Sequence, residues 1–270
     1  MMQDFSFYDP SPLLRPYVKY YWILKDNGKK GSIAQRVIPT GCLQLIFHRK
    51  ERLFSSGEKV LQPRAFLGGQ MIGYDDLVFT GTIDMVVVVF NPQGAGPFFP
   101  VPLSELSGKT VPIAEISQEM ALLENRVLDT RENQEAIRLI ESFLLKTLVS
   151  SQNYHAARVT ATIHAINRNP HLTLDELSEM ACLSPKQYGR VFTGQTGFKP
   201  KEFARIVRLQ RALYLLQQYP HITLSRLTYE CGFYDQAHMV REFKAISGYT
   251  PKEYLSVCEP YSDYFSGKKE

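Results

Sequence analysis

Two short segments near the C-terminal end of the chain combine arginine, lysine, amide and small side chains at close spacing. The first holds Lys186, Gly189 and Arg190, and the second holds Gln236, Ala237, His238, Arg241 and Lys244. Arginine can donate two hydrogen bonds to one guanine, and a glutamine amide can pair with adenine. Small residues let a helix backbone come close to its partner. These residue types therefore indicate contact with a nucleic acid duplex.

The two segments belong to an internal repeat. The sequence Pro-His-Leu-Thr-Leu at 170–174 recurs as Pro-His-Ile-Thr-Leu at 220–224, and Leu177 recurs as Leu227. Further along, Arg190 corresponds to Arg241, and other pairs keep that later offset (Tyr188/Met239, Phe192/Phe243, Gly197/Gly248, Pro200/Pro251). One residue has been added between the two stretches. Two copies of one supersecondary unit are predicted, at about 171–197 and 221–248.

The first copy carries start and stop signals for two short helices. Thr173 and Glu176 are spaced as a capping box that opens the first helix. After a turn at Cys182-Leu183, Ser184 caps the second helix, with Pro185 in its first position. Gly197 supplies the left-handed residue that ends it.

The second copy repeats this plan with different residues. Gly232-Phe233-Tyr234 forms the turn, Asp235 is the helix cap, and Gly248 is the stop. Thr250 and Glu253 then form a capping box for a further helix.

A helical wheel separates two faces on the second helix of each copy. Tyr188, Val191 and Phe192 share one face of the first, as Met239, Phe243 and Ile246 do in the second. The opposite faces hold the small and basic residues. A helix that buries one side and presents such residues on the other fits a DNA major groove, so the unit is predicted to be a helix-turn-helix.

The charge of the chain is uneven. Residues 1–150 contain 16 Lys and Arg against 16 Asp and Glu, whereas residues 151–270 contain 15 against 11, so the whole net charge of +4 lies in the C-terminal part. A single helical hairpin with a solvated basic face is the alternative interpretation. Two copies in register, on the basic part of the chain, favour DNA.

These motifs resemble the DNA-binding domain of AraC/XylS-type transcriptional regulators. The resemblance spans about 155–258 and includes Leu183-Ser184-Pro185, the stretch Arg208–Ala212, and the run from Cys231 to His238. It implies two helix-turn-helix units joined by a rigid helix. The base contacts that it implies come from Lys186, Gly189 and Arg190 in the first unit and from Gln236, Ala237, His238 and Arg241 in the second. Gly189 departs from the family pattern, which often has a larger polar residue there, and this predicts weaker base reading by the first unit.

The N-terminal part is predicted to be rich in strands. Tyr17–Leu24, Cys42–His48 and Met85–Phe90 have strand length and composition, with turns at Pro39-Thr40-Gly41 and Gly68-Gly69. Helical spacing follows in the segments 116–127 and 137–148. This part resembles the β-rich sensor or dimerisation domain of some such regulators. A small cupin-like barrel is expected, with an effector site, a dimer interface or both; alternation places Tyr20, Trp22 and Arg36 on the wall of that site.

Other chemistries have little support in the sequence. The N-terminal region has one histidine, His48, which we interpret as a strand-end residue because a metal-dependent cupin needs several ligands. Cys42 lies in an apolar strand without a basic neighbour, unlike an activated alkyl-accepting cysteine. The four cysteines show no C-x-x-C pair, and there is no phosphate-binding loop. No enzyme activity, metal or cofactor is predicted.

The fold class expected is α+β in two domains, divided at a polar linker at Ser150–Asn153. Residues 1–150 form the β-rich domain ending in helices, and residues 151–270 form the all-α DNA-binding domain. Double-stranded DNA is the predicted partner, with a homodimer, a small-molecule effector and RNA polymerase as further expected partners. No membrane segment or signal peptide is apparent, which places the protein in the cytoplasm. The alternative is a small-molecule-binding β domain with a helical interaction module outside transcription.

Overall fold

The computed structural model describes residues 4–26, 34–148 and 155–257. The predicted linker at Ser150–Asn153 lies outside these residues. The N-terminal domain contains the strands β1 (Asp4–Tyr8), β2 (Val18–Asp26), β3 (Ala34–Val37), β4 (Gln44–His48), β5 (Leu53–Ser55), β6 (Val60–Leu61), β7 (Ala65–Gly68), β8 (Asp75–Phe79), β9 (Ile83–Phe90) and β10 (Thr110–Pro112). The three strands predicted from the sequence are confirmed as β2, β4 and β9.

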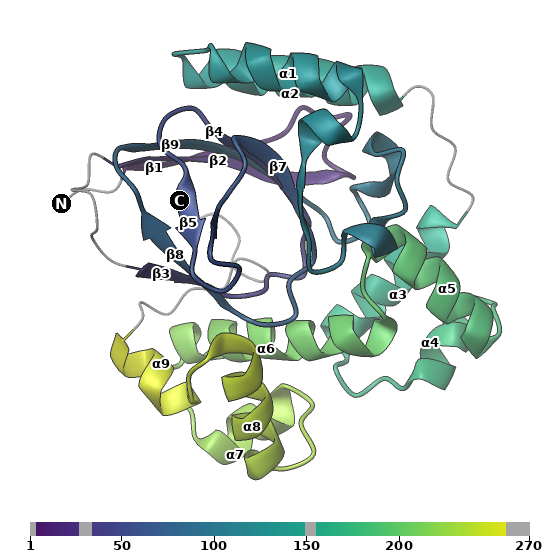
Figure 1. The fold of residues 1–270 in the computed structure, drawn as a ribbon. Coiled ribbons are helices and arrows are strands. Elements are labelled where there is room, and N and C mark those ends of the chain that lie inside the picture. Colours follow the sequence, from purple (N-terminus) through teal and green to yellow (C-terminus); the bar gives the residue numbers. More distant parts are fainter. Residues whose placement is uncertain (1–3, 27–33, 149–154, 258–270) are drawn as a thin grey trace.

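The strands form two antiparallel sheets that face each other (Figure 1). One has the order β1-β2-β9-β4-β7-β10 and the other β3-β8-β5-β6. Among the described residues, β1, β10, β3 and β6 each pair with one neighbour only, so the ladders do not close. Over the described ranges, the small cupin-like barrel expected from the sequence thus takes the form of two antiparallel sheets whose ladders stay open.

The central strand β9 is buried on both faces. Met85, Val87 and Val89 point into the space between the sheets, where they pack with Leu24 and Phe79. The alternate residues Val86, Val88 and Phe90 belong to a second core outside the six-stranded sheet. Successive side chains of a strand point to opposite faces, so a strand with a core on each side buries all of them. This burial explains the uninterrupted apolar run Met85–Phe90 within β9.

Two helices cover the outer face of the six-stranded sheet (Figure 1). These are α1 (Gln118–Leu128) and α2 (Asn133–Leu148), which confirm the predicted helical segments. They follow three short 3₁₀ helices: η1 (Gly96–Phe98), η2 (Leu103–Leu106) and η3 (Ile113–Glu115). Met120, Ile140 and Leu144 are buried against the sheet.

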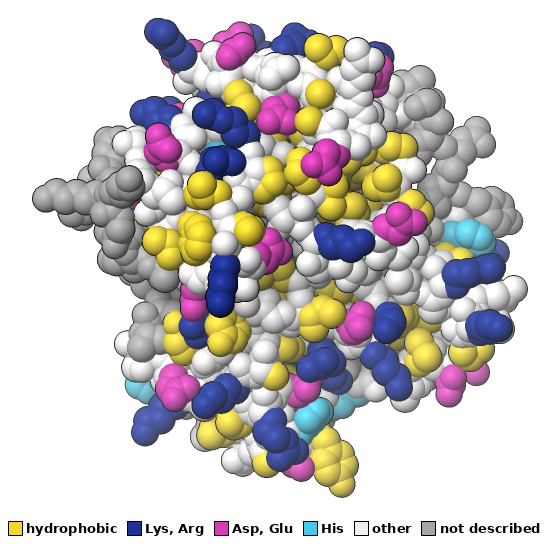
Figure 2. Space-filling model, viewed as in Figure 1, with side chains coloured by type: hydrophobic (Ala, Val, Ile, Leu, Met, Phe, Trp, Pro, Cys, Tyr) yellow, Lys and Arg dark blue, Asp and Glu magenta, His cyan; other side chains and the backbone are white. Residues whose placement is uncertain are grey.

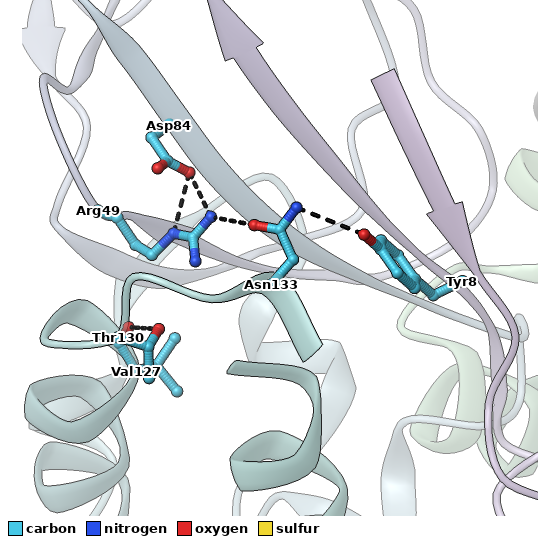
Figure 3. Close-up of polar contacts among 6 residues, drawn as sticks. All are labelled: Tyr8, Arg49, Asp84, Val127, Thr130 and Asn133. Atoms are coloured by element: carbon cyan, nitrogen blue, oxygen red, sulfur yellow. Dashed lines mark hydrogen bonds and ion pairs between the residues drawn. The ribbon is translucent and has the colours of Figure 1, made fainter. Parts of the chain in front are cut away.

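A buried ion pair fixes the junction between α1 and α2 to the sheet (Figure 3). The Arg49 guanidinium donates to Asp84 Oδ1 through Nε at 2.9 Å and through Nη2 at 2.5 Å, and Nη2 also donates to Asn133 Oδ1 at 2.8 Å. Asn133, the first residue of α2, donates in turn to the Tyr8 hydroxyl at 3.4 Å. The pair thus joins β9, the end of β4 and the start of α2.

His48 ends strand β4, as predicted, and is fully buried. Its Nε2 lies 3.1 Å from Gln62 Oε1, and its ring stacks on Phe66. Burial, together with the nearby charges of Arg52 and Arg64, lowers the pKa of His48 from 6.5 to about 4. The imidazole is therefore neutral in the folded protein at neutral pH.

We expect this histidine to make the protein sensitive to acid. Between pH 6.5 and pH 4 the unfolded chain binds a proton that the folded state rejects, so the free energy of unfolding falls as pH is lowered through this range. The loss approaches roughly 3 kcal/mol. Urea unfolding at a series of pH values measures it. The His48→Phe variant should lose this part of the pH dependence, whereas exposed His171→Gln should keep it; identical slopes in all three proteins would refute the assignment.

The C-terminal domain is helical. Its elements are α3 (Ala156–Arg168), α4 (Leu174–Met180), α5 (Pro185–Thr196), α6 (Pro200–Gln218), α7 (Leu224–Glu230), α8 (Gln236–Ser247) and α9 (Pro251–Val257). The long helix α6 runs beneath the two sheets and joins the two helical units that precede and follow it in the chain (Figure 1). Its Phe203 and Val207 pack into the core of the first unit, and Leu213 and Leu216 into that of the second.

The helices and the potential metal-ligating side chains of the described residues can be compared with what membrane spans and metal sites require. Among them, none of the helices has the length and apolar character that crossing a bilayer requires. Within the same ranges, histidine, cysteine and acidic side chains do not gather in groups of three or more as a metal site would need.

Candidate nucleic-acid interface

Local signals in the sequence define α5 as predicted. The Ser184 backbone N–H donates to Gln187 Oε1 at 3.2 Å, and the Gln187 N–H donates back to Ser184 Oγ at 3.4 Å. Pro185 occupies the first turn, and Gly197 ends the helix in the left-handed region at φ +77°. These reciprocal bonds satisfy amide groups that the helix start leaves without partners.

The second helix of the other unit has equivalent ends. Asp235 accepts a hydrogen bond from the His238 N–H at 2.6 Å, and Gly248 ends α8 at φ +77°. The same glycine angle at both stops shows that the repeat extends to the backbone. The predicted caps and stops are therefore confirmed in both units.

The apolar faces of α5 and α8 are buried as the helical wheel predicted. Tyr188 and Phe192 are fully buried in the first unit, and Met239 and Phe243 in the second. A further ion pair, Arg205 to Glu242 at 2.5 Å, ties α8 to α6. Helices α5 and α8 thus each have one face packed in the core of their unit and one face toward solvent.

The solvent face of α5 carries three of the predicted site residues. Lys186 and Arg190 are exposed, and Gly189 between them is half-buried. A Cβ at Gly189 would have open space around it, so packing does not require glycine here. The backbone at this position is therefore open to close approach by a partner, while it offers no side chain of its own for reading bases.

The solvent face of α8 carries the remaining five. Ala237, Arg241 and Lys244 are exposed and point away from the core. Gln236 is also exposed, but its amide donates to Ser225 Oγ of α7 at 2.8 Å. Among the described residues, Arg190 and Arg241 form no ion pair with the chain, which leaves both guanidinium groups available to a partner.

His238 is half-buried at the beginning of α8. Its Nδ1 lies 3.4 Å from the Tyr234 N–H, and its ring packs edge-on against Phe233 at 5.7 Å between centroids. Half of the imidazole is thus engaged by the preceding turn. The family resemblance implied base contact by this residue, and the preceding turn covers one edge of its ring.

Two exposed residues next to α8 were missed by the sequence reasoning. Tyr234, immediately before the helix cap, is 92% exposed. Ser225, in the first turn of α7, lies against Gln236 and so beside the same helix end. A bulky aromatic in the turn before a recognition helix was the available signal for Tyr234; no sequence signal pointed to Ser225.

The turns of the two units place different residue types at an equivalent position with positive φ. Cys182 is exposed and adopts a positive φ of 52°, and Gly232 takes the equivalent place at φ 75°. A residue with a Cβ is disfavoured in this region, whereas glycine is not. The first unit therefore contains local backbone strain that the second lacks.

We expect Cys182→Gly to stabilise the protein by about 0.5–1 kcal/mol, because relief of strain exceeds the added freedom of glycine in the unfolded chain. Urea or thermal unfolding of the full chain measures the change. The matched variant, Gly232→Ala, should destabilise by at least as much, since its Cβ would lie 2.9 Å from Pro170. A loss of stability in Cys182→Gly would contradict this account.

Basic side chains accompany these helices. Figure 2 shows Lys and Arg along the lower part of the molecule, which the C-terminal helices form, with acidic groups between them. The field is thus moderately positive rather than uniformly basic, in keeping with the modest excess of charge in this part of the sequence.

Comparison with protein families divides the chain in the same way as the fold. Residues 6–112 match a domain of unknown function, DUF6597, and residues 177–256 match a family described as a helix-turn-helix domain. The second match begins within α4 and covers the rest of both repeat units, including the caps and glycine stops of α5 and α8. The family comparison thus agrees with the helix-turn-helix units that the repeat predicted.

Curated relatives of the chain are named as regulators with this type of domain. An uncharacterized HTH-type transcriptional regulator of Haemophilus influenzae is 27% identical over 133 residues, covering 47% of this chain and 44% of the relative. The HTH-type transcriptional activator RhaR of Salmonella schwarzengrund is 29% identical over 96 residues, covering 36% and 33%. The chain thus spans less than half the length of these relatives.

Solved structures similar to the chain include a two-domain protein and an isolated DNA-binding domain. ToxT from Vibrio cholerae aligns with a TM-score of 0.46 at 11% identity, covering 87% of this chain and 98% of ToxT. The DNA-binding domain of AdpA, solved with a target DNA, aligns with a TM-score of 0.35 at 20% identity, covering 37% and 90%.

Proposed function

We propose that this protein is a sequence-specific DNA-binding transcription regulator whose helices α5 and α8 read adjacent major grooves. One observation carries the proposal. Arg190 and Arg241 are exposed at equivalent positions of the repeat, on helices whose opposite faces are fully anchored. An arginine can bind one guanine with two hydrogen bonds, so the repeat provides two such contacts on one chain.

The other exposed residues take roles that follow from their chemistry. Lys186 and Gln236, at the beginnings of α5 and α8, donate to base edges, and Gly189 and Ala237 let the helix backbones come close to the groove. His238 contributes the ring edge that the turn leaves uncovered. Lys244, in the last turn of α8, contacts phosphate.

We assign the regulatory part of the function to the N-terminal domain. Residues 1–150 act as a sensor or dimerisation domain, and residues 151–270 as the DNA-binding domain. A small-molecule effector, a second copy of the chain and RNA polymerase are the partners that such a regulator would need. The two facing sheets support this assignment, with Tyr20 and half-buried Trp22 on their inner side. Arg36 is no part of that wall, since its side chain stacks on Tyr249 of the C-terminal domain.

Selection of binding sites from random DNA duplexes tests the proposal. The full-length protein is used near physiological salt, because salt-resistant enrichment separates specific from merely electrostatic binding. We expect two enriched motifs about 10 base pairs apart, one for each helix. Absence of enrichment would overturn the proposal and favour a helical module that binds a different partner.

A further inference from the structure

One loop of the N-terminal domain reaches both helix-turn-helix units. The clamp loop, residues 69–74, connects β7 to β8. Its base is fixed, because the Gly69 N–H donates to the Lys109 carbonyl at 2.8 Å and the Gly108 N–H donates to the Gln70 carbonyl at 3.1 Å. A Cβ at Gly69 would overlap the carbonyl of Leu106, so only glycine allows this close approach.

The loop holds the end of α5 through Gln70. This side chain is 98% buried, being 2% exposed, and its Nε2 donates to the Thr196 carbonyl. That carbonyl lies in the last turn of α5, where the helix leaves carbonyl groups without internal partners. A Cβ at Gly197 would overlap the same amide. Helix α5 also packs against η1 and against η2, whose Leu106 lies at the base of the loop.

The other end of the loop holds the end of α8. The Arg36 guanidinium lies between two rings, 4.0 Å from the centroid of Tyr74 and 4.4 Å from that of Tyr249, and it is fixed by Asp76 at 2.8 Å. A Cβ at Gly248 would overlap both Arg36 and Tyr74. The cation therefore sits beside the C-terminal end of α8, where it is favoured electrostatically.

These two contacts fall at equivalent places in the repeat. Thr196-Gly197 corresponds to Ser247-Gly248, and both hydroxyls donate to the carbonyl four residues earlier. A third contact lies between them, since buried Gln210 of α6 donates to the Pro39 carbonyl at 2.7 Å. The N-terminal domain thus contacts both units and the helix that connects them, through residues other than the exposed Arg190 and Arg241.

We propose that Gln70 and Arg36 are positioning residues that set the relative placement of α5 and α8, so that the state of the N-terminal domain controls which spacing of DNA sites the protein accepts. The DNA part of this inference rests on the proposed function. Two helices held in one arrangement bind two sites without a further ordering cost, but only at the matching separation. Release of either contact should widen the accepted spacing.

Hydrogen exchange of the full-length protein tests the clamp without DNA. Gln70→Glu keeps the size of the side chain and removes its donor; it should raise exchange about fivefold in the last turn of α5. Arg36→Ala should do the same for α8 and leave α5 unchanged. Ile72→Ala, at an exposed site of the same loop, is the control. Unchanged exchange in both helices, or a rise extending equally through β9, would overturn the clamp.

Binding to duplexes with shifted site spacing tests the consequence. Wild-type protein should prefer one spacing, and the Gln70→Glu/Arg36→Ala variant should bind sites moved by one or two base pairs with affinity within about threefold of its best site. A spacing preference as sharp as that of the wild type would overturn the positioning role. If the wild type binds no duplex while the exchange results hold, the proposed function fails and the clamp stands.

Discussion

The Arg190→Ala/Arg241→Ala double variant is expected to bind the selected DNA site more weakly by roughly 2–6 kcal/mol. Each arginine contact to a guanine contributes about 1–3 kcal/mol of discrimination, and contacts in separate units add nearly independently. Both side chains are exposed, so the free energy of unfolding should stay within about 0.5 kcal/mol of wild type. Equilibrium titration with the selected duplex measures the loss.

Controls separate base reading from general attraction. Lys252→Ala removes an exposed positive charge from α9, outside the recognition helices, and should weaken binding by much less. Each single arginine variant should lose its preference at one base pair. An equal loss on selected and random duplexes would instead place both arginines on phosphate groups.

The Asp84→Ala variant is expected to lose about 3–5 kcal/mol of stability, because it leaves the Arg49 guanidinium buried without its counter-ion. The Arg49 side chain is 2% exposed and that of Asp84 is 14% exposed, so water cannot readily replace the carboxylate. The loss of stability should extend to α2, because its first residue, Asn133, accepts a hydrogen bond from the same guanidinium. Urea unfolding of the full chain, followed by circular dichroism, measures the change.

A double-mutant cycle tests this interpretation. Arg49→Met combined with Asp84→Ala removes the buried charge and should recover most of the loss. The exposed pair Lys146–Glu119, whose side chains are 75% and 64% exposed, provides the comparison: Glu119→Ala should cost less than about 1 kcal/mol. Equal losses in the Asp84→Ala and Glu119→Ala variants would contradict the role of burial.

Local chemistry alone determined the helix-turn-helix units. The capping pairs Thr173 with Glu176 and Ser184 with Gln187 lie three residues apart, so they act within a single turn of the chain. Left-handed glycine stops and the apolar faces of α5 and α8 likewise depend on neighbours within a few residues. Because of the repeat, helix caps, glycine stops and apolar faces occur in both units. For these reasons the helix bounds and the exposed arginines could be predicted without a structure.

Contacts between distant residues were decided only by the tertiary structure. Gln70 meets Thr196, and Arg36 meets Tyr249, across more than a hundred residues of sequence, and no periodic pattern links such pairs. The same limit explains the error over Arg36, which strand alternation assigned to a ligand-site wall. Whether two sheets close into a barrel also depends on how their edge strands meet.

The sequence by itself thus determined the bounds of α5 and α8 and the exposed residues on them, since helix ends and helix faces are properties of short segments. The tertiary structure alone decided how α5 and α8 are held relative to each other. Helix α6 packs into the cores of both units, and the clamp loop contacts the end of α5 through Gln70 and the end of α8 through Tyr74; these contacts exist only when the whole chain is folded.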